Sequence, residues 1–287
     1  MTPADRIATL TGSAVSTLRQ IGGQHLWQHF RGTLADGREF FAKYSERSFA
    51  SALRTEAAGL RWLAGPGLVP VPGVLGADDH ALVIDWVAPS PPSEAAARAF
   101  GARLARLHAV GADCFGAPWP GYIASLPLDN EPDHGGPAAW PQWYARCRLL
   151  PFLRRAADAG ALRRADIEPV EAVIARIGDL AGPPEPPSRL HGDCWSGNVL
   201  WSAGQAWLID PAAHGGHRET DLAMLALFGA PHLDSILDAY NATAPLADGW
   251  PARVPLHQLH PLLVHACLFG AGYAASVRAA AQATLTA

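Results

Sequence analysis

The chain has 287 residues, of which 49% are hydrophobic and 17% charged, with a formal net charge of -4 at pH 7. This composition is typical of a folded globular protein and excludes a disordered chain. The negative charge and the absence of a cluster of Lys and Arg argue against a nucleic-acid partner. No continuous apolar stretch approaches the roughly 18 residues that span a bilayer, and the N-terminus lacks the apolar run of a signal peptide. We therefore expect a cytoplasmic monomer that is not bound to a membrane.

The spacing of the metal-binding residue types does not predict a structural metal. The four cysteines occur without a C-x-x-C pair, so neither a zinc site nor a disulfide framework is indicated. The twelve histidines lack spacings such as H-E-x-x-H. We expect free thiols in a reducing compartment; the cysteines are Cys114, Cys147, Cys194 and Cys267.

Residues 1–88 are predicted to form a small N-terminal lobe. Gly22 and Gly23 indicate a first turn, and strands at 30–34 and 39–43 flank Asp36-Gly37, a strong hairpin signal because this turn needs positive φ. A helix is predicted over 49–63 and ends before a Gly-Pro-Gly cluster. Extended segments follow at 69–74 and 81–87.

Residues 89–287 are predicted to form a larger and mostly helical lobe. Ser93 is a candidate N-cap for a helix over 94–109, and residues 115–136 are expected to be a loop. Further helices are predicted over 138–160, 167–180 and from 221 onward, with two short strands at 199–201 and 206–209. A chain of this length can bury two such cores.

Five residues occur in the order that phosphoryl transfer requires. Such an enzyme needs a cation on the nucleotide phosphates, oxygen ligands for Mg²⁺, and a carboxylate that orients the acceptor hydroxyl. Asp193 and Asn198 have the spacing of the kinase H-R-D-x-x-x-x-N loop, and Asp210 follows on the next short strand. Lys43 at the end of a strand and Glu56 in the next helix have the order of the kinase lysine–glutamate pair. Each residue alone is common on protein surfaces, but the five together predict a kinase.

The segment 190–228 carries a long and specific pattern. It reads H-G-D-x-W-S-G-N-V-L-W, then I-D-P-A, then G-H-R-E-x-D-L-A-M-L-x-L-F-G. This pattern resembles the fructosamine kinase family, which is related to aminoglycoside phosphotransferases and choline kinases, and the similarity extends over nearly the whole chain. The resemblance implies an α+β, two-lobed, protein-kinase-like fold with a small antiparallel sheet in the N-lobe. It also implies ATP-dependent phosphorylation of the 3-hydroxyl of ketoamines, with deglycation of a metabolite or of a glycated lysine on a protein as the purpose.

The resemblance assigns roles on the nucleotide side of the site. Lys43 and Glu56 look like the pair that steadies the phosphates of ATP. The Gly22-Gly23 turn looks like the loop that covers those phosphates. Asp85, Trp86 and Val87 resemble the hinge between the lobes, where the adenine would bond to backbone groups.

Further roles fall on the catalytic loop and the segments after it. Asp193 looks like the catalytic base, and Asn198 and Asp210 look like the Mg²⁺ ligands. Trp195 and His217 are candidates for binding the acceptor, although a tryptophan at this position could equally pack in a core. The remaining candidates, which would support the catalytic loop structurally, are His191, Arg218 and Asp221.

Two alternatives stay open at this stage. A kinase of the same fold could act on another hydroxyl substrate, such as an aminoglycoside, choline or a homoserine-like metabolite. The chain could also be a nucleotide-binding pseudokinase, which the intact set of Lys43, Asp193, Asn198 and Asp210 argues against. Cys194 is expected to be a buried apolar residue, since no Lys or Arg beside it in the sequence would lower its pKa.

Overall fold

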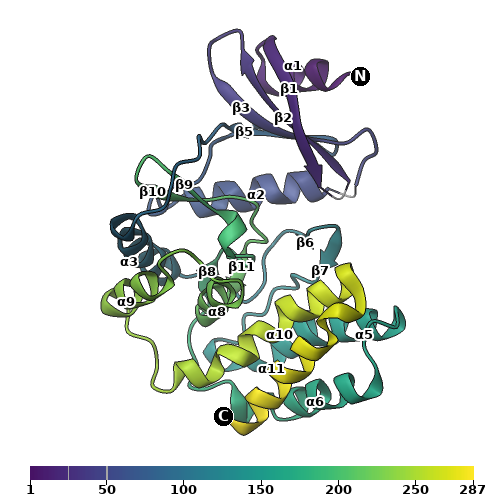
Figure 1. Ribbon diagram of the computed structural model, residues 1–287, viewed down its shortest axis with the longest axis vertical. Helices are drawn as coiled ribbons and strands as arrows, with labels where there is room; N and C mark the ends of the chain where they lie inside the picture. Colours follow the sequence, from purple (N-terminus) through teal and green to yellow (C-terminus); the bar gives the residue numbers. More distant parts are fainter. Residues whose placement is uncertain (25, 50) are drawn as a thin grey trace.

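A five-stranded antiparallel sheet, in the order β1-β2-β3-β5-β4, forms the N-terminal part of the protein in this computed structural model, which describes residues 1–24, 26–49 and 51–287. Figure 1 shows this sheet and its two helices above a larger helical lobe. The elements of the sheet lobe are α1 (Pro3–Thr11), β1 (Val15–Gln24), β2 (Trp27–Leu34), β3 (Glu39–Tyr44), α2 (Ala52–Ala64), β4 (Val74–Ala77) and β5 (Ala81–Asp85).

The alternation of side chains along β5 explains why the sheet holds a helix on each face. Ala81 and Val83 point into a cluster with Ile7 of α1, whereas Leu82 and Ile84 point into a second cluster with α2. Successive residues of a strand face opposite sides of its sheet, so a continuous apolar run predicts a strand covered on both sides. The apolar run at 81–87 therefore contributes to the hydrophobic clusters on both faces of the sheet.

The predicted hairpin is confirmed, but several boundaries differ. β2 and β3 pair around Asp36-Gly37, where Gly37 has a φ of 87°. The predicted turn at Gly22 and Gly23 is wrong, because both residues continue β1 and pair with His29 and Gln28 of β2. The polar segments that form α1 and most of β1 gave no strong periodic signal and were not predicted.

The predicted helix over 49–63 is present as α2, which begins at Ala52. Residue 50, inside the predicted range, lies outside the described part of the chain. The extended segment predicted over 69–74 becomes a regular strand only at Val74, because prolines at 70 and 72 cannot donate backbone hydrogen bonds to a sheet.

The larger lobe begins with α3 (Glu94–Val110), whose N-cap is Ser93 as predicted: the Ser93 side chain accepts a hydrogen bond from the amide of Ala96. β5 ends at Asp85, so a lobe boundary near residue 88 stays a prediction. The helices that follow are α4 (Trp140–Tyr144), α5 (Leu150–Asp158), α6 (Arg164–Ala175), α7 (Ile177–Leu180), α8 (Glu219–Leu227), α9 (Leu233–Thr243), α10 (Trp250–Phe269) and α11 (Ala274–Thr286).

Short hairpins join these helices. The predicted strands near 199 and 206 are confirmed as an antiparallel pair, whereas the predicted loop over 115–136 contains a further hairpin. The helix predicted over 138–160 is divided, since a π-helical segment, Ala145–Leu149, separates α4 from α5. The strands of this lobe are β6 (Gly121–Ile123), β7 (Leu126–Leu128), β8 (Ser188–Leu190), β9 (Val199–Ser202), β10 (Gln205–Leu208) and β11 (His214–Gly216).

The last two helices form the stretch Trp250–Thr286, which is apolar and long enough to cross a membrane by length and composition alone. The expectation that no stretch approached this length was therefore wrong. Leu256, Leu259 and Leu263 of α10 are nevertheless fully buried against the other helices of the lobe. A core helix of a globular protein passes the same composition test, so this stretch is weak evidence for a membrane.

Candidate active site

A cavity between the sheet and the helical lobe collects the residues that the sequence singled out for chemistry. Lys43 enters it from β3 and Glu56 from α2, while the opposite wall comes from the catalytic loop and the residues after β10. The lining residues are Trp27, His29, Lys43, Ala52, Thr55, Glu56, Tyr122, Ile123, Ala124, Asp193, Trp195, Asn198, Asp210, Pro211 and Ala212.

Lys43 holds two carboxylates in this cavity. Its Nζ lies 3.0 and 2.9 Å from the two carboxylate oxygens of Glu56 and 2.9 Å from Oδ1 of Asp210. Burial alone would lower the pKa of Lys43, but the charges of Asp210 and Glu56 outweigh it and raise this pKa. Lys43 is therefore a fixed positive charge, as a group that binds nucleotide phosphates must be.

The two carboxylates respond to burial in opposite ways. Burial raises the pKa of Glu56 above its ordinary value, although Lys43 opposes the change. Burial also acts against ionisation of Asp210, but the Lys43 charge and hydrogen bond lower the pKa of Asp210 overall. Asp210 is consequently the ionised partner of Lys43 and the better candidate for a cation ligand.

Asp193 and Asn198 face each other across the catalytic loop. The Asn198 side-chain amide donates to Oδ2 of Asp193 at 2.8 Å and to the Asp193 backbone carbonyl at 2.9 Å. Burial, followed by the nearby charge of Asp210, raises the pKa of Asp193 to about 7. A carboxylate with that pKa can accept a proton near neutral pH, which is the property of a general base.

Asn198 and Asp210 form the pair that fits a divalent cation. Because Nδ2 of Asn198 donates to Asp193, its Oδ1 is left as an acceptor that no other residue in the described ranges engages. Asp210 has a φ of 52°, an uncommon backbone conformation for a residue other than glycine that is associated with functional sites. Carboxylate and amide oxygens are the donors that Mg²⁺ prefers, so the donor set fits that ion.

Asp221 of α8 fixes the backbone of the catalytic loop, as predicted. Its carboxylate accepts hydrogen bonds from the amides of His191 at 2.8 Å and Gly192 at 2.9 Å. His108 of α3 contacts the same carboxylate at 3.2 Å and was not predicted, because its position on an apolar helix face indicated only a core residue. The loop is thus anchored to two helices of the larger lobe.

His191 also supports the loop, as predicted. Its Nε2 lies 2.8 Å from the carbonyl oxygen of Ile209, the residue before Asp210. Gly192 has a φ of 81°, and a Cβ there would lie 2.2 Å from the carbonyl oxygen of Ala212. The H-G-D sequence therefore requires its glycine for steric reasons, and its histidine ties the base to the cation-binding segment.

The residues predicted for the outer nucleotide site lie apart from the lining of this cavity. Gly22 and Gly23 are in β1, next to the turn into β2. In the predicted hinge, the amides of Asp85 and Trp86 donate to Gly73 and Glu39. Val87 has no backbone partner for its amide among the described residues, which leaves a donor at the position predicted to meet the adenine.

Trp195 lies where an acceptor-binding residue is expected. It lines the cavity beside Asp193, and 36% of its surface is exposed. The alternative of a core tryptophan is disfavoured, since the ring belongs to none of the buried clusters.

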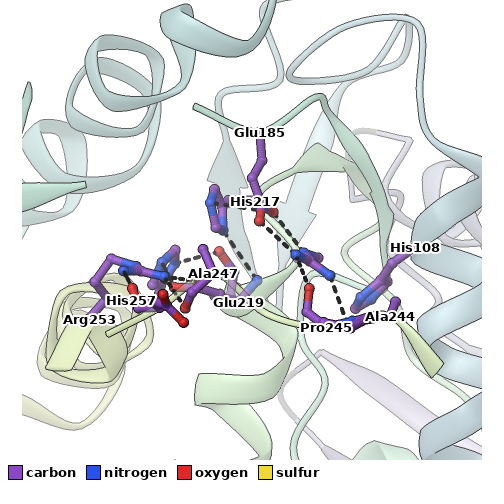
Figure 2. A network of polar contacts seen from close by, with 12 residues as sticks. His108, Glu185, His217, Glu219, Ala244, Pro245, Ala247, Arg253 and His257 are labelled. Carbon is purple, nitrogen blue, oxygen red and sulfur yellow. Dashed lines mark hydrogen bonds and ion pairs between the residues drawn. The ribbon is translucent and has the colours of Figure 1, made fainter. Parts of the chain in front are cut away.

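His217 does not occupy the position that an acceptor-binding residue would need. It is only 3% exposed and lies in a buried network away from the cavity, which Figure 2 shows. Its ring centroid is 4.8 Å from that of Trp140 and 5.0 Å from that of His257. The sequence suggested proximity to the acceptor only because His217 follows the catalytic segment closely along the chain.

The predicted support of the catalytic loop by Arg218 is also wrong. Its guanidinium binds Glu185 with two contacts of 2.7 Å and the carbonyl oxygens of Ala244 and Pro245. These contacts join the proline-rich connector, which holds Glu185, to the segment after α9; Figure 2 labels Glu185, Ala244 and Pro245. Arg218 therefore stabilises the far side of the lobe and reaches no atom of the catalytic loop.

Glu219 lies at the centre of the network in Figure 2, and atoms of His217, Glu219 and His257 lie within 4.8 Å of one another, close enough for metal ligands. Arg253, however, occupies both oxygens of Glu219 at 2.9 and 2.6 Å. Burial disfavours the ionised form of Glu219, but hydrogen bonds with His257 and Arg253 outweigh it and lower the pKa of Glu219 to about 2. The arginine already balances the carboxylate, so the cluster does not require a cation.

Three aromatic residues of the cavity lining were missed by the sequence reasoning. Trp27 and His29 lie on β2, and Tyr122 lies on β6 of the unpredicted hairpin. His29 lies opposite Lys43 in the β2–β3 register, and alternation along a strand would have placed its side chain on the same face. Tyr122 gave no such signal, since a loop was expected there.

The fold and the convergence of Lys43, Asp193 and Asp210 are those of a protein-kinase-like phosphotransferase that acts on a hydroxyl group. A family model described as fructosamine kinase matches residues 2–287, and the chain belongs to this family.

Individual relatives agree with this assignment. A crystal structure of a "putative fructosamine-3-kinase" from Thermobifida fusca YX-ER1 is 52% identical with a TM-score of 0.95, over 100% of this chain and 99% of that one. The "probable ketoamine kinase YniA" of Escherichia coli (strain K12) is 33% identical over 240 residues, 82% of this chain and 81% of that protein. A macrolide 2'-phosphotransferase from Brachybacterium faecium shares the fold, with 20% identity and a TM-score of 0.64 over 96% of each chain.

Proposed function

We propose that this protein transfers the γ-phosphoryl group of ATP to the 3-hydroxyl of a ketoamine, a sugar joined through its carbonyl-bearing end to an amine. The observation that carries the proposal is the contact between Lys43 and Asp210 across the cavity, with Asp193 and Asn198 beside it. Membership of the fructosamine kinase family supports the choice of acceptor. We further propose ATP and Mg²⁺ as cosubstrate and cofactor, and a cytoplasmic monomer as the working form.

The residues of the chain divide the work of the reaction. Lys43, held by Glu56, would bind the phosphates, and Asp210 with Asn198 would hold the cation. When bound, Mg²⁺ neutralises phosphate charge and orients the γ-phosphoryl group. Asp193 would accept the hydroxyl proton as the new oxygen–phosphorus bond forms and the bond to the ADP oxygen breaks. The products are the phosphorylated ketoamine and ADP.

A substrate panel with the purified protein tests this proposal. ADP release and product mass are measured with MgATP and, separately, a fructosamine, a ribulosamine, an aminoglycoside, choline and homoserine. We expect phosphate on the ketoamines, at the 3-oxygen by ³¹P–¹H correlation. Preferential turnover of one of the other acceptors would replace the ketoamine with that acceptor.

Absence of turnover on the whole panel, combined with a Mg²⁺-dependent stabilisation by ATP, would identify a nucleotide-binding pseudokinase instead. The Asp193→Asn variant is the matched control, because it removes the base and retains the shape and the hydrogen bond to Asn198. We expect its turnover to fall by about 10²–10⁴-fold, the usual contribution of general base catalysis.

A further inference from the structure

A continuous series of aromatic rings leads from the catalytic cavity onto the surface of the larger lobe. The Trp195 ring meets Phe228 edge-on at 5.8 Å, and Phe228 lies 5.0 Å from His265. His265 in turn lies 5.4 Å from Phe269 and 5.0 Å from Tyr273. We call these five residues the aromatic platform.

The chain brings the platform together from three separate segments. Trp195 belongs to the catalytic loop, and Phe228 is the C-cap residue of α8. His265 and Phe269 are one turn apart at the end of α10, which places their rings on one helix face. Figure 1 shows the turn between α10 and α11, which carries Tyr273, at the end of the lobe that faces the sheet.

Two large apolar side chains of the aromatic platform are exposed to solvent. Phe269 is 57% exposed and Trp195 36% exposed, and Phe228 belongs to none of the buried clusters. Large apolar side chains that remain contiguous at a surface commonly mark a binding site. One end of this surface is fixed in place, because Trp195 lines the cavity together with Asp193.

The platform is also free of positive charge near neutral pH. Nδ1 of His265 lies 2.7 Å from the carbonyl oxygen of Pro261, a contact in which the ring nitrogen donates. Burial lowers the pKa of His265, so its ring is neutral. A neutral aromatic surface does not repel the protonated amine of a ketoamine and can contact an aromatic ring placed beyond that amine.

We propose that the aromatic platform binds the substituent on the amine of the acceptor, and that it favours free ketoamines whose amine carries an aromatic ring. This inference rests on the proposed function. With the reacting hydroxyl at Asp193, the amine end of the acceptor leaves the cavity past Trp195. The substituent then lies over Phe228, Phe269 and Tyr273.

Two ketoamines that share one sugar test this inference. One is derived from phenylalanine and the other from glycine, so they differ only in the benzyl group. Stacked or edge-on aromatic contacts predict a kcat/KM about two- to tenfold higher for the phenylalanine derivative, arising in KM. In Phe269→Ala and Tyr273→Ala this ratio should approach one, whereas Phe269→Tyr, which keeps a ring, should preserve it.

Val110→Ala is the matched control, because Val110 is 47% exposed on α3, remote from the platform in the chain and outside its ring contacts. It should leave the ratio unchanged. The ratio uses the glycine derivative as an internal reference, so a partly unfolded variant does not imitate the effect. Equal kcat/KM values for the two ketoamines in the unaltered protein, or a ratio that survives both alanine variants, would overturn the inference. If neither ketoamine is phosphorylated, the proposed function is wrong and the platform proposal falls with it.

Discussion

Lys43 Nζ lies 2.9 Å from Oδ1 of Asp210, although Lys43 is on the sheet and Asp210 follows β10 in the helical lobe. This contact joins the two lobes across the cavity. The same amine also pairs with Glu56, so one positive charge faces two carboxylates. The excess negative charge lies beside Asn198, where a cation would be held.

Replacement of Lys43 should reveal how strongly the two carboxylates depend on it. In Lys43→Met, Glu56 and Asp210 lose their partner, and we expect the free energy of unfolding at pH 8 to fall by about 1–3 kcal/mol. Burial already raises the pKa of Glu56, and without Lys43 this pKa should rise further, while the pKa of Asp210, which Lys43 lowers, should also rise. A raised carboxyl pKa means that stability is lost as pH rises, so the deficit should shrink at pH 5.

Urea unfolding at the two pH values measures this effect. Arg54→Met is the control, since Arg54 pairs with Asp79 at an exposed site and its removal should leave the free energy of unfolding almost unchanged at both pH values. If Lys43→Met lowers the free energy of unfolding by the same amount at pH 5 and pH 8, the pKa values of Glu56 and Asp210 do not depend on Lys43.

Asp193→Asn should separate catalysis from stability. The folded-state pKa of Asp193 is about 7, whereas an unfolded aspartate titrates near 3.9. Ionisation above about pH 4 therefore lowers stability, and the loss is complete above about pH 7. Without magnesium, the asparagine variant should be more stable than the unaltered protein by roughly 1–3 kcal/mol at pH 8 and equal to it near pH 4. Unfolding in the presence of a chelator measures the difference; a variant that is less stable at pH 8 would refute it.

The elements that were predicted correctly are those that a few neighbouring residues specify. Asp36-Gly37 indicates a hairpin by its backbone requirement, and Ser93 indicates a helix start by its hydrogen-bonding oxygen. α1 and most of β1 escaped prediction because their apolar residues are few and give no strong periodic signal. The interruption of the helix over 138–160 has a local marker that the prediction did not use, since Pro151 at the start of α5 has no backbone N–H to donate within a helix.

The candidate site residues also separate into those that the sequence could predict and those whose positions depend on tertiary contacts. Lys43, Asp193 and Asp210 were predicted because phosphoryl transfer restricts both residue type and order. His217 and Arg218 were misplaced because sequence proximity to Asp210 was treated as proximity in space, whereas β11 turns the chain away toward α10. Side-chain direction after a short strand depends on tertiary contacts that one sequence does not display.

Gly192→Ala should disable the catalytic loop. The substitution meets both a positive φ of 81° and a Cβ position 2.2 Å from the carbonyl oxygen of Ala212. We expect a loss of more than about 2 kcal/mol in stability, with activity per folded molecule also reduced. Gly204→Ala is a close control, because Gly204 has a φ of 74° and no atom near the added Cβ. Gly204→Ala therefore measures only the cost of a positive φ for alanine, about 1 kcal/mol of stability. If both variants lose the same stability, the contact with Ala212 is unimportant.

Trp195→Ala should act on the acceptor and not on the nucleotide. Trp195 lines the cavity from the catalytic loop that carries Asp193, whereas Lys43 and Glu56 enter it from β3 and α2. We expect the KM of a ketoamine to rise about tenfold or more while the KM of ATP changes less than twofold. Trp195→Phe keeps a ring and should recover part of the affinity. A large loss of thermal stability with unchanged acceptor KM would instead favour a packing role.

Glu219→Gln tests whether the buried network of Figure 2 is structural. The change removes the charge partner of Arg253, which is only 9% exposed, and leaves that cation buried. Breaking a buried pair in this way costs about 3–5 kcal/mol. Glu94→Gln is the control: it removes an exposed pair with Arg98 and should leave the free energy of unfolding almost unchanged. Among the described residues, the side chain of Glu219 contacts Arg253 and His257 and not Asp193, Asn198 or Asp210. The kcat per folded molecule should therefore stay within about twofold at a temperature where the variant is folded. A selective loss of kcat, or stabilisation of the unaltered protein by added Zn²⁺ that Glu219→Gln abolishes, would assign the cluster a functional role instead.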